Sequence, residues 1–244
     1  MTNSVAFGKT MRKDKWWVEP LLVGLGFAAF IVYATFRACE NQLYETGPYL
    51  SPFYSPKFNF GWWHMSPAFL ILWIPAGFRA TCYYYRKAYY RAYFADPIAC
   101  AVGDLGSKKY CGEAGFPLVL QNCHRYFFYL ATLVLAVLWY DTIRAFFFGG
   151  SFHMSLVSLV MLVNVILLSG YSFGCHACRH LAGGGLNCFS ANACSKSKFQ
   201  IWTCISKLNE HHMAWAWLSL FSVGFTDFYI RQVASGALPE IRFF

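Results

Sequence analysis

Long apolar runs separated by polar stretches dominate the chain. We expect five of them to be helices, at residues 17–37, 64–85, 123–148, 152–173 and 211–233. Each run approaches the roughly 20 residues that an α-helix needs to cross a bilayer. Pro75 should kink the second helix, because proline removes a backbone donor. The pattern predicts an all-α integral membrane protein, a single transmembrane domain (1–244) with five transmembrane helices in a bundle.

The composition agrees with a membrane protein. Of the 244 residues, 57% are hydrophobic and only 13% are charged. The net charge of +9 would also suit a nucleic-acid partner. We exclude that class because the basic residues lie at helix ends and in loops, where membrane topology requires them. Residues 1–15 are polar and basic, so we expect no cleavable signal peptide.

The distribution of charge predicts how the chain is oriented. Most of the twenty Lys and Arg residues fall on the side that holds the N-terminus and the stretches 88–122 and 181–209. The positive-inside rule therefore places the N-terminus in the cytoplasm and the C-terminus outside. The same two stretches are too long for simple turns, so we expect them to be cytoplasmic docking loops.

The cysteines follow the same division. All but Cys39 of the ten cysteines fall on the predicted cytoplasmic side. Disulfides rarely persist in cytosol, so a disulfide framework is excluded. Metal binding or packing as small apolar side chains remains.

The densest cluster of candidate ligands is Cys175-His176-Ala177-Cys178-Arg179-His180, at the end of the fourth apolar run. It is no c-type haem signature, because Arg179 follows the second cysteine. Thiolates and imidazoles bind iron–sulfur clusters, zinc and haem iron. A structural zinc held by Cys175, Cys178, His180 and either Cys188 or Cys194 is one alternative, and plain packing is another.

Two other predicted helix ends carry similar chemistry on the same side. Cys82 closes the second apolar run, and His211 and His212 open the fifth. Adjacent helical residues point about 100° apart, so one of the two histidines should face the bundle, and we expect it to be His212. His64 and His153, near the outer surface on the second and fourth helices, could pair as haem ligands or only hydrogen-bond at the interface.

Three polar residues lie within the apolar runs: Asp141, Asn164 and Asp227. Polar groups inside a membrane domain face the bundle or a water path and are functional candidates. Arg144, three residues after Asp141, could simply pair with it.

Several motifs together resemble a known family. They are Gly77-Phe78-Arg79-Ala80-Thr81-Cys82-Tyr83-Tyr84-Tyr85-Arg86, Gln121-Asn122-Cys123-His124-Arg125-Tyr126, Ser169-Gly170-Tyr171-Ser172-Phe173-Gly174-Cys175-His176 and His212-Met213-Ala214-Trp215-Ala216-Trp217. They are similar to the five-helix, single-chain membrane anchor subunit of actinobacterial-type succinate dehydrogenase (complex II). The resemblance implies an enzyme subunit of the cell membrane. Its flavoprotein and iron–sulfur partners dock on the cytoplasmic face, and electrons from succinate pass to menaquinone.

The resemblance also implies a cofactor. Helix one lacks histidine and Cys82 takes the expected ligand position on helix two, which points to the branch with a Rieske-type [2Fe–2S] cluster in place of the inner haem. Such a cluster takes two cysteines on one iron and two histidines on the other. The implied ligands are Cys82, Cys175, His180 and His212, with His124 and His176 in reserve.

For quinone binding, the implied hydrogen-bond donors are His124, Arg79 and Tyr83. Two alternatives stay open. One is a subunit holding haem b through His64 and His153 or through the cytoplasmic-side histidines. The other is a membrane protein with a cytoplasmic zinc module and no redox role.

Overall fold

The computed structural model describes residues 6–104, 112, 114–116 and 118–244. These residues form two compact units, Met1–Tyr33 with Ala76–His124 and Ala34–Pro75 with Arg125–Phe244. Each unit is described by itself. Cys111 and part of the predicted 88–122 loop lie outside the described residues.

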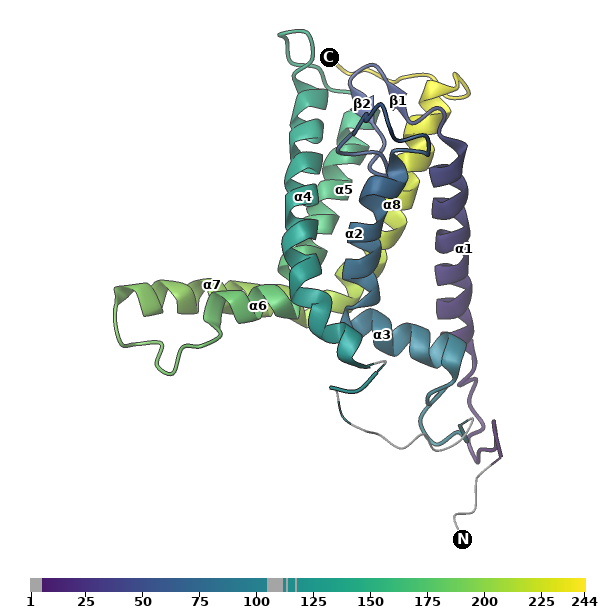
Figure 1. The fold of residues 1–244 in the computed structure, drawn as a ribbon, viewed down its shortest axis with the longest axis vertical. Coiled ribbons are helices and arrows are strands. Elements are labelled where there is room, and N and C mark those ends of the chain that lie inside the picture. The colour runs from purple at the N-terminus through teal and green to yellow at the C-terminus, as the bar shows by residue number, and fades with distance from the viewer. Residues whose placement is uncertain (1–5, 105–111, 113, 117) are drawn as a thin grey trace. The chain divides into compact units, whose positions relative to one another are not determined.

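The helices of the chain are mostly those that the apolar runs predict (Figure 1). They are α1 (Val18–Glu40), α2 (Ala68–Ala80), α3 (Tyr83–Tyr89), α4 (His124–Phe146), α5 (Leu156–Phe173), α6 (His176–Gly183), α7 (Ala193–Glu210) and α8 (His212–Ala234), with a π-helical turn at Tyr90–Phe94 and a 3-10 turn at Leu118–Cys123. In the described part of the chain, three segments are long and apolar enough to cross a membrane: Val18–Glu40, Leu118–Phe146 and Leu156–Phe173. The chain is therefore an all-helical membrane protein, and the count of five spans stays a prediction.

The predicted second helix, 64–85, is wrong at both ends. It begins only at Ala68 and continues through Pro75 to Ala80. The chain then breaks at Thr81 and Cys82 and starts α3 at Tyr83. The Thr81 hydroxyl donates to the carbonyl of Gly77 (2.7 Å), and Cys82 has extended backbone angles. Apolar content alone did not reveal this break, because tyrosines and alanines continue across it.

The stretch 181–209, which we expected to be a docking loop, contains most of α7, so its structure is largely helical, while its docking role stays a prediction. Asn192 caps this helix, and its side chain accepts a hydrogen bond from the Ser195 N–H (2.8 Å). Helices α6 and α7 pack against each other as a hairpin that starts at the ends of α5 and α8 and projects sideways from them (Figure 1). Glycine and serine around residue 190 obscured the helical pattern in the sequence.

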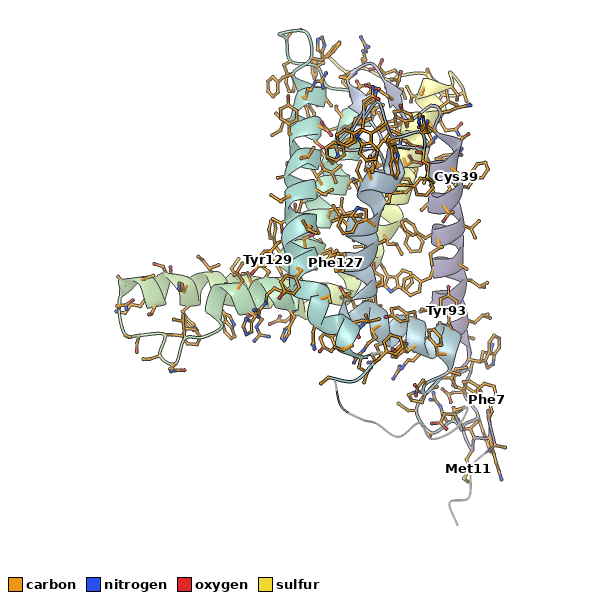
Figure 2. All side chains as sticks on the ribbon, in the orientation of Figure 1. Phe7, Met11, Cys39, Tyr93, Phe127 and Tyr129 are labelled. Atoms are coloured by element: carbon orange, nitrogen blue, oxygen red, sulfur yellow. The ribbon has the colours of Figure 1, made fainter. Side chains whose placement is uncertain are left out.

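In the second unit, α5 and α8 pack side by side and antiparallel. The turn before α5 runs through Gly149 and Gly150, which both adopt positive φ angles (68° and 83°) that favour glycine. Ser155 then caps α5 in a reciprocal capping box with Ser158, so this helix begins at Leu156 rather than at residue 152. Figure 2 marks Phe127 and Tyr129 in the first turns of α4.

The stretch between α1 and α2 is more than a polar loop. It forms a short hairpin, β1 (Glu45–Thr46) with β2 (Tyr49–Leu50), and then the segment 51–55 is buried in the second unit. The hydroxyl of Ser51 donates to Asp227, and that of Ser55 donates to Asp141. These bonds account for two of the polar residues that the apolar runs contain, and they fix the loop over this end of α4 and α8.

Candidate functional site

In the first unit, the break after α2 orients His124. The Thr81 hydroxyl, whose proton goes to the Gly77 carbonyl, lies 2.9 Å from His124 Nδ1. While the Thr81 hydroxyl donates to Gly77, its oxygen accepts from His124 Nδ1–H, and Nε2 is then the accepting nitrogen of the neutral imidazole. The ring is buried and stacks on Phe78, with centroids 4.7 Å apart. A histidine held through Nδ1 in this way can offer Nε2 to a metal or to a hydrogen-bond donor.

Cys82 lies next to Thr81 in the same break. It stands at the N-cap of α3 and is buried, and Cys175 is buried at the N-cap of α6 in the second unit, with 3% and 1% of their surfaces exposed. Both cysteines thus occupy the short extended link between an apolar helix and a following short helix. The Cys175 sulfur accepts a hydrogen bond from the Ala177 N–H (3.3 Å).

The predicted quinone donors Arg79 and Tyr83 lie on either side of the break. The Arg79 guanidinium donates to the buried Tyr85 hydroxyl and lies over its ring. Tyr83 is exposed, with the Arg86 guanidinium 4.8 Å above its ring. The structure thus brings Arg79 and Tyr85 together, and the part played by Tyr85 was not predicted.

In the second unit, His212 begins α8 and packs inward, whereas His211 is exposed, as predicted. The His212 ring stacks on buried Tyr171 of α5, with centroids 5.1 Å apart and planes 20° from parallel. One turn along α8, the Trp215 ring lies so close to Gly170 that an added Cβ there would come within 2.6 Å of it. Trp215 Nε1–H is buried and has no acceptor among the described residues.

Close packing also fixes the backbone beside Cys175. The Asn209 side chain at the end of α7 donates to the Gly174 carbonyl (2.7 Å). A Cβ at Gly174 would come within 2.6 Å of the Gly170 carbonyl oxygen. The position of Cys175 is therefore set by three helices, α5, α6 and α7.

His180 is placed differently from the other predicted ligands. It is exposed on α6, and the Arg125 guanidinium donates to its Nδ1 at 2.9 Å. Gly184 packs closely against the same ring, because a Cβ added at Gly184 would lie 2.7 Å from His180 Nδ1. His176, the other reserve, is exposed at the start of α6.

Burial separates the cysteines clearly. Of the nine described cysteines, only Cys82 and Cys175 are buried. Cys178 is half-buried, and burial raises the pKa of its thiol. Cys188 is exposed, and its hydrogen bond with the Ser190 hydroxyl lowers the pKa of its thiol. Cys82 and Cys175, the two cysteines predicted as cluster ligands, are thus the described cysteines that solvent does not reach.

The fit of an iron–sulfur cluster depends on this donor set. Within the described ranges, no group of three or more His, Cys, Asp or Glu side chains is gathered closely enough to hold a metal ion. Two buried thiols, the buried His124 and the partly buried His212 are the residue types that a mixed Cys/His cluster takes. Cys82 and His124 belong to one unit, and Cys175, His180 and His212 belong to the other.

Other polar residues do not join these groups. His64 is exposed and His153 accepts or donates a hydrogen bond with Ser151 (2.8 Å), and both lie outside the helices on which we expected them. The Asp141 carboxylate accepts a hydrogen bond from the Ser55 hydroxyl. Asn164 is buried on α5 and accepts from Ser222, and Asp227 accepts from Arg231.

Sequence reasoning missed Thr81, Tyr85 and Tyr171 as residues that contact the candidate site residues His124, Arg79 and His212. Each lies within a motif that the resemblance covered, but each reads as a packing residue on its own. Their roles come from contacts across helices, such as Tyr171 with His212, that spacing along one helix does not reveal.

These features define a class first: a multi-pass helical membrane protein with cysteines and histidines at the ends of its helices. Residues 18–236 match the family model of the actinobacterial succinate dehydrogenase subunit SdhC, and the chain belongs to that family. It is thus a membrane subunit of the succinate dehydrogenase complex, and membrane subunits of that enzyme generally bind quinone.

A solved structure supports the assignment. A chain of the Mycobacterium smegmatis Sdh1 complex, solved in the apo form, is 45% identical and superposes with a TM-score of 0.86. The match covers 96% of this chain and 94% of that one. No curated protein matched this sequence.

Proposed function

We propose that this subunit anchors the flavoprotein and iron–sulfur subunits of succinate dehydrogenase at the cytoplasmic face and passes their electrons to menaquinone. A Rieske-type [2Fe–2S] cluster would be held in its membrane part. The observation that carries the proposal is the burial of Cys82 and Cys175, each at the N-cap of a short helix that follows a longer apolar one. When bound, such a cluster stores one electron, and its imidazole ligands raise its potential.

Cys82, Cys175, His180 and His212 are the proposed ligands. Their burial favours the two cysteines as ligands, and its stacking on Tyr171 favours His212. His180 is the least supported, because it is exposed and bonded to Arg125. His124 is the alternative fourth ligand, since it is buried and Thr81 leaves Nε2 as its accepting nitrogen.

Quinone binding is proposed for the first-unit residues at the break after α2. Arg79 and Tyr83 can donate hydrogen bonds to a quinone carbonyl, as can His124 if it carries a proton on the nitrogen that faces the ring. Phe78 and the tyrosines of α3 offer the flat apolar surfaces that a quinone ring needs. These residues would orient the ring and supply hydrogen bonds that strengthen as charge develops on its oxygens.

We also propose five spans, with the N-terminus in the cytoplasm. The exposed face of α8 is apolar, with Met213, Leu218, Phe221, Phe225 and Phe228 all at least 40% exposed. Its low average hydropathy comes from polar residues on the inward face, including Ser219, Thr226 and Asp227. A helix that is apolar outside and polar inside suits a bundle surrounded by lipid.

Electron paramagnetic resonance of the reduced, purified complex tests the cluster. We expect a Rieske-like signal with a low average g value, lost in Cys82→Ala and in His212→Ala, while succinate oxidation with an artificial dye survives. Cys178→Ala is the matched control and should keep the signal. If both Cys82→Ala and His212→Ala keep the signal unchanged, the ligand assignment is wrong.

The same spectrum decides the fourth ligand. His180→Ala and His124→Ala are compared, and only the ligand should abolish the signal. Iron analysis of the same samples separates a cluster from a zinc module, and a Soret absorption band would instead indicate haem b.

A further inference from the structure

The hairpin of α6 and α7 lies beside the apolar helices of its unit, and the proposed electron transfer does not pass along it. It projects sideways from the ends of α5 and α8 (Figures 1 and 2). Helix α7 has 18 residues, as many as α5, but it is not among the described segments that are apolar enough to cross a membrane. Where α5 crosses the bilayer, a hairpin that turns sideways at its end lies along the membrane surface.

The hairpin is held rigidly in this direction. The Asn209 side chain, at the end of α7, donates to the Gly174 carbonyl at the end of α5 (2.7 Å). Between α6 and α7, a Cβ added at Gly183 would come within 2.4 Å of the Trp202 ring. The Arg179 guanidinium lies 4.6 Å from the centroid of that ring on its other contact. These contacts fix how α7 is rotated about its own axis, so each of its faces has a defined direction.

Three stripes run along α7. The stripe that packs on α6 holds the buried Ser195 and Ile205 with Trp202 between them. A second stripe, which we call the apolar stripe, has exposed members that include Ile201 (55% exposed) and Cys204. Its residues follow at three- and four-residue spacing, and they are Cys194, Ser197, Ile201, Cys204 and Leu208. The third stripe is polar and consists of Lys196, Gln200, Thr203, Lys207 and Glu210.

The charge of the hairpin has one sign. Residues 175–209 include Arg179, Lys196, Lys198 and Lys207 and contain no Asp or Glu. Successive helical residues point about 100° apart, so Lys198 falls on one edge of the apolar stripe and Lys207 on the other. Lysine stems can lie along an apolar surface while their ammonium groups reach the level of lipid headgroups. An apolar stripe bordered by cations complements an anionic lipid surface.

A partner protein would need a different surface. Protein interfaces are centred on large aromatic or arginine anchors. The apolar stripe has no aromatic residue, and the aromatic rings of the hairpin pack on one another instead: Phe189 lies 4.9 Å from Phe199 and 5.8 Å from Trp202. The composition of the stripe therefore favours lipid over protein as its occupant.

We infer that the apolar stripe of α7 lies against the cytoplasmic leaflet of the membrane, where Lys198 and Lys207 bind the phosphate groups of anionic phospholipids. The inference rests on the proposed topology for the choice of leaflet. It adds a lipid-binding surface to the proposed function. Because Asn209 joins the hairpin to the end of α5, lipid bound there would hold Cys175 at a fixed depth in the membrane.

A nitroxide label on α7 tests which stripe meets lipid. The whole complex is placed in nanodiscs of phosphatidylcholine and phosphatidylglycerol, with Ile201→Cys or its neighbour Gln200→Cys labelled and the other exposed cysteines replaced by serine. Oxygen concentrates in lipid and a nickel chelate stays in water, so the ratio of their collision rates reports the surroundings of the label. We expect that ratio to be several times higher at position 201 than at position 200. The native Cys204, labelled in the same way, should match position 201, and it decides the matter if Ile201→Cys does not assemble.

The lysines are tested with the label on Cys204. In discs of phosphatidylcholine alone, the ratio should fall, because the anionic headgroups are missing. The double variant Lys198→Gln/Lys207→Gln should give this lower ratio even in discs with phosphatidylglycerol. Arg144→Gln is the control, since Arg144 is an exposed cation at the far end of α4, and it should leave the ratio unchanged.

Each contrary result has a distinct meaning. Equal access of the nickel chelate to positions 200 and 201 overturns the inference, because the stripe would then face water. A label at position 201 that neither reagent reaches also overturns it, because a partner protein would then cover the stripe. An unchanged ratio in the lysine double variant overturns the assignment of the headgroup ligands. Failure of the proposed function looks different, because the collision rates are measured without turnover, whereas that failure appears as wild-type complex without quinone reduction or cluster signal.

Discussion

At the residue scale, the tautomer of the His124 imidazole depends on one hydroxyl group. The Thr81 hydroxyl donates to Gly77 and accepts from His124 Nδ1–H, so it selects the tautomer of the imidazole. Removing such a partner of a metal-binding histidine typically lowers metal affinity or activity by 10- to 100-fold.

Thr81→Val should therefore lower the rate of menaquinone reduction by about tenfold, because valine keeps the shape and removes the acceptor. Thr81→Ser retains the hydroxyl and should stay close to wild type. The measurement is quinone reduction alongside dye reduction by the same complex. Equal rates in Val and Ser variants would mean that the hydroxyl does not orient His124.

Gly170 makes a second prediction at this scale. Its α-carbon faces the Trp215 ring, and a methyl group would come within 2.6 Å of it. Gly170→Ala should lower the free energy of unfolding by about 1–3 kcal/mol through overpacking, and should shift Trp215 and His212. Thermal unfolding and the cluster signal report the two effects. Gly61→Ala, where nothing lies within 4 Å, is the control and should change neither.

The sequence alone singled out the two cysteines that are buried among the described residues. Cys82 and Cys175 were picked because thiols at helix ends are ligand chemistry, and their burial agrees with that choice. Thr81 and Tyr171 could not be found in this way. Their importance depends on contacts with His124 and His212, and those contacts arise only when helices pack.

At the element scale, the apolar runs predicted helices well where one face meets lipid. They failed where a helix breaks or lies outside the apolar runs. Helix α3 continues a run of tyrosines past the break at Cys82, and α7 is polar on average yet packs on α6 through the Arg179 guanidinium over Trp202 (4.6 Å). The average hydropathy of α8 is low because its inward face is polar, although its outward face is apolar.

Helix α8 is further tied to the rest of its unit by buried charges. Arg231, 2% exposed, binds Asp227 at 2.9 Å and Glu40 at 3.1 Å. Arg231→Leu should lower the free energy of unfolding by about 3–5 kcal/mol, because Asp227 loses the guanidinium that balances its buried charge. Thermal unfolding of the solubilised complex measures this loss.

Two controls make that prediction specific. The exposed pair of Arg12 and Asp14 should contribute little because solvent screens it, so Arg12→Ala should leave the thermal unfolding transition close to that of wild type. The double variant Arg231→Leu/Asp227→Leu should recover much of the stability. No recovery would show that the lost interaction is packing or the Glu40 contact rather than the Asp227 charge.

At the scale of the whole molecule, the basic residues determine the expected orientation. The family assignment makes the chain an anchor of succinate dehydrogenase, but it does not by itself say which loops face the cytoplasm. The positive-inside rule makes that prediction, and it predicts that the hairpin of α6 and α7 faces the cytoplasm. Cys188, in the turn of that hairpin, is exposed and can report its side.

Labelling with a membrane-impermeant maleimide in sealed vesicles of known orientation tests this topology. Cys188 should react only when the cytoplasmic face is exposed to the reagent. The Ser190 hydroxyl lowers the pKa of Cys188, so more thiolate is present at a given pH and the reaction is faster than for an ordinary exposed thiol. Ser190→Ala should raise that pKa and slow labelling at pH 7, while Cys188→Ser removes this label and leaves the labelling of Cys194 unchanged. Reaction of Cys188 from the outer side would reverse the orientation and, with it, the face on which the partner subunits dock.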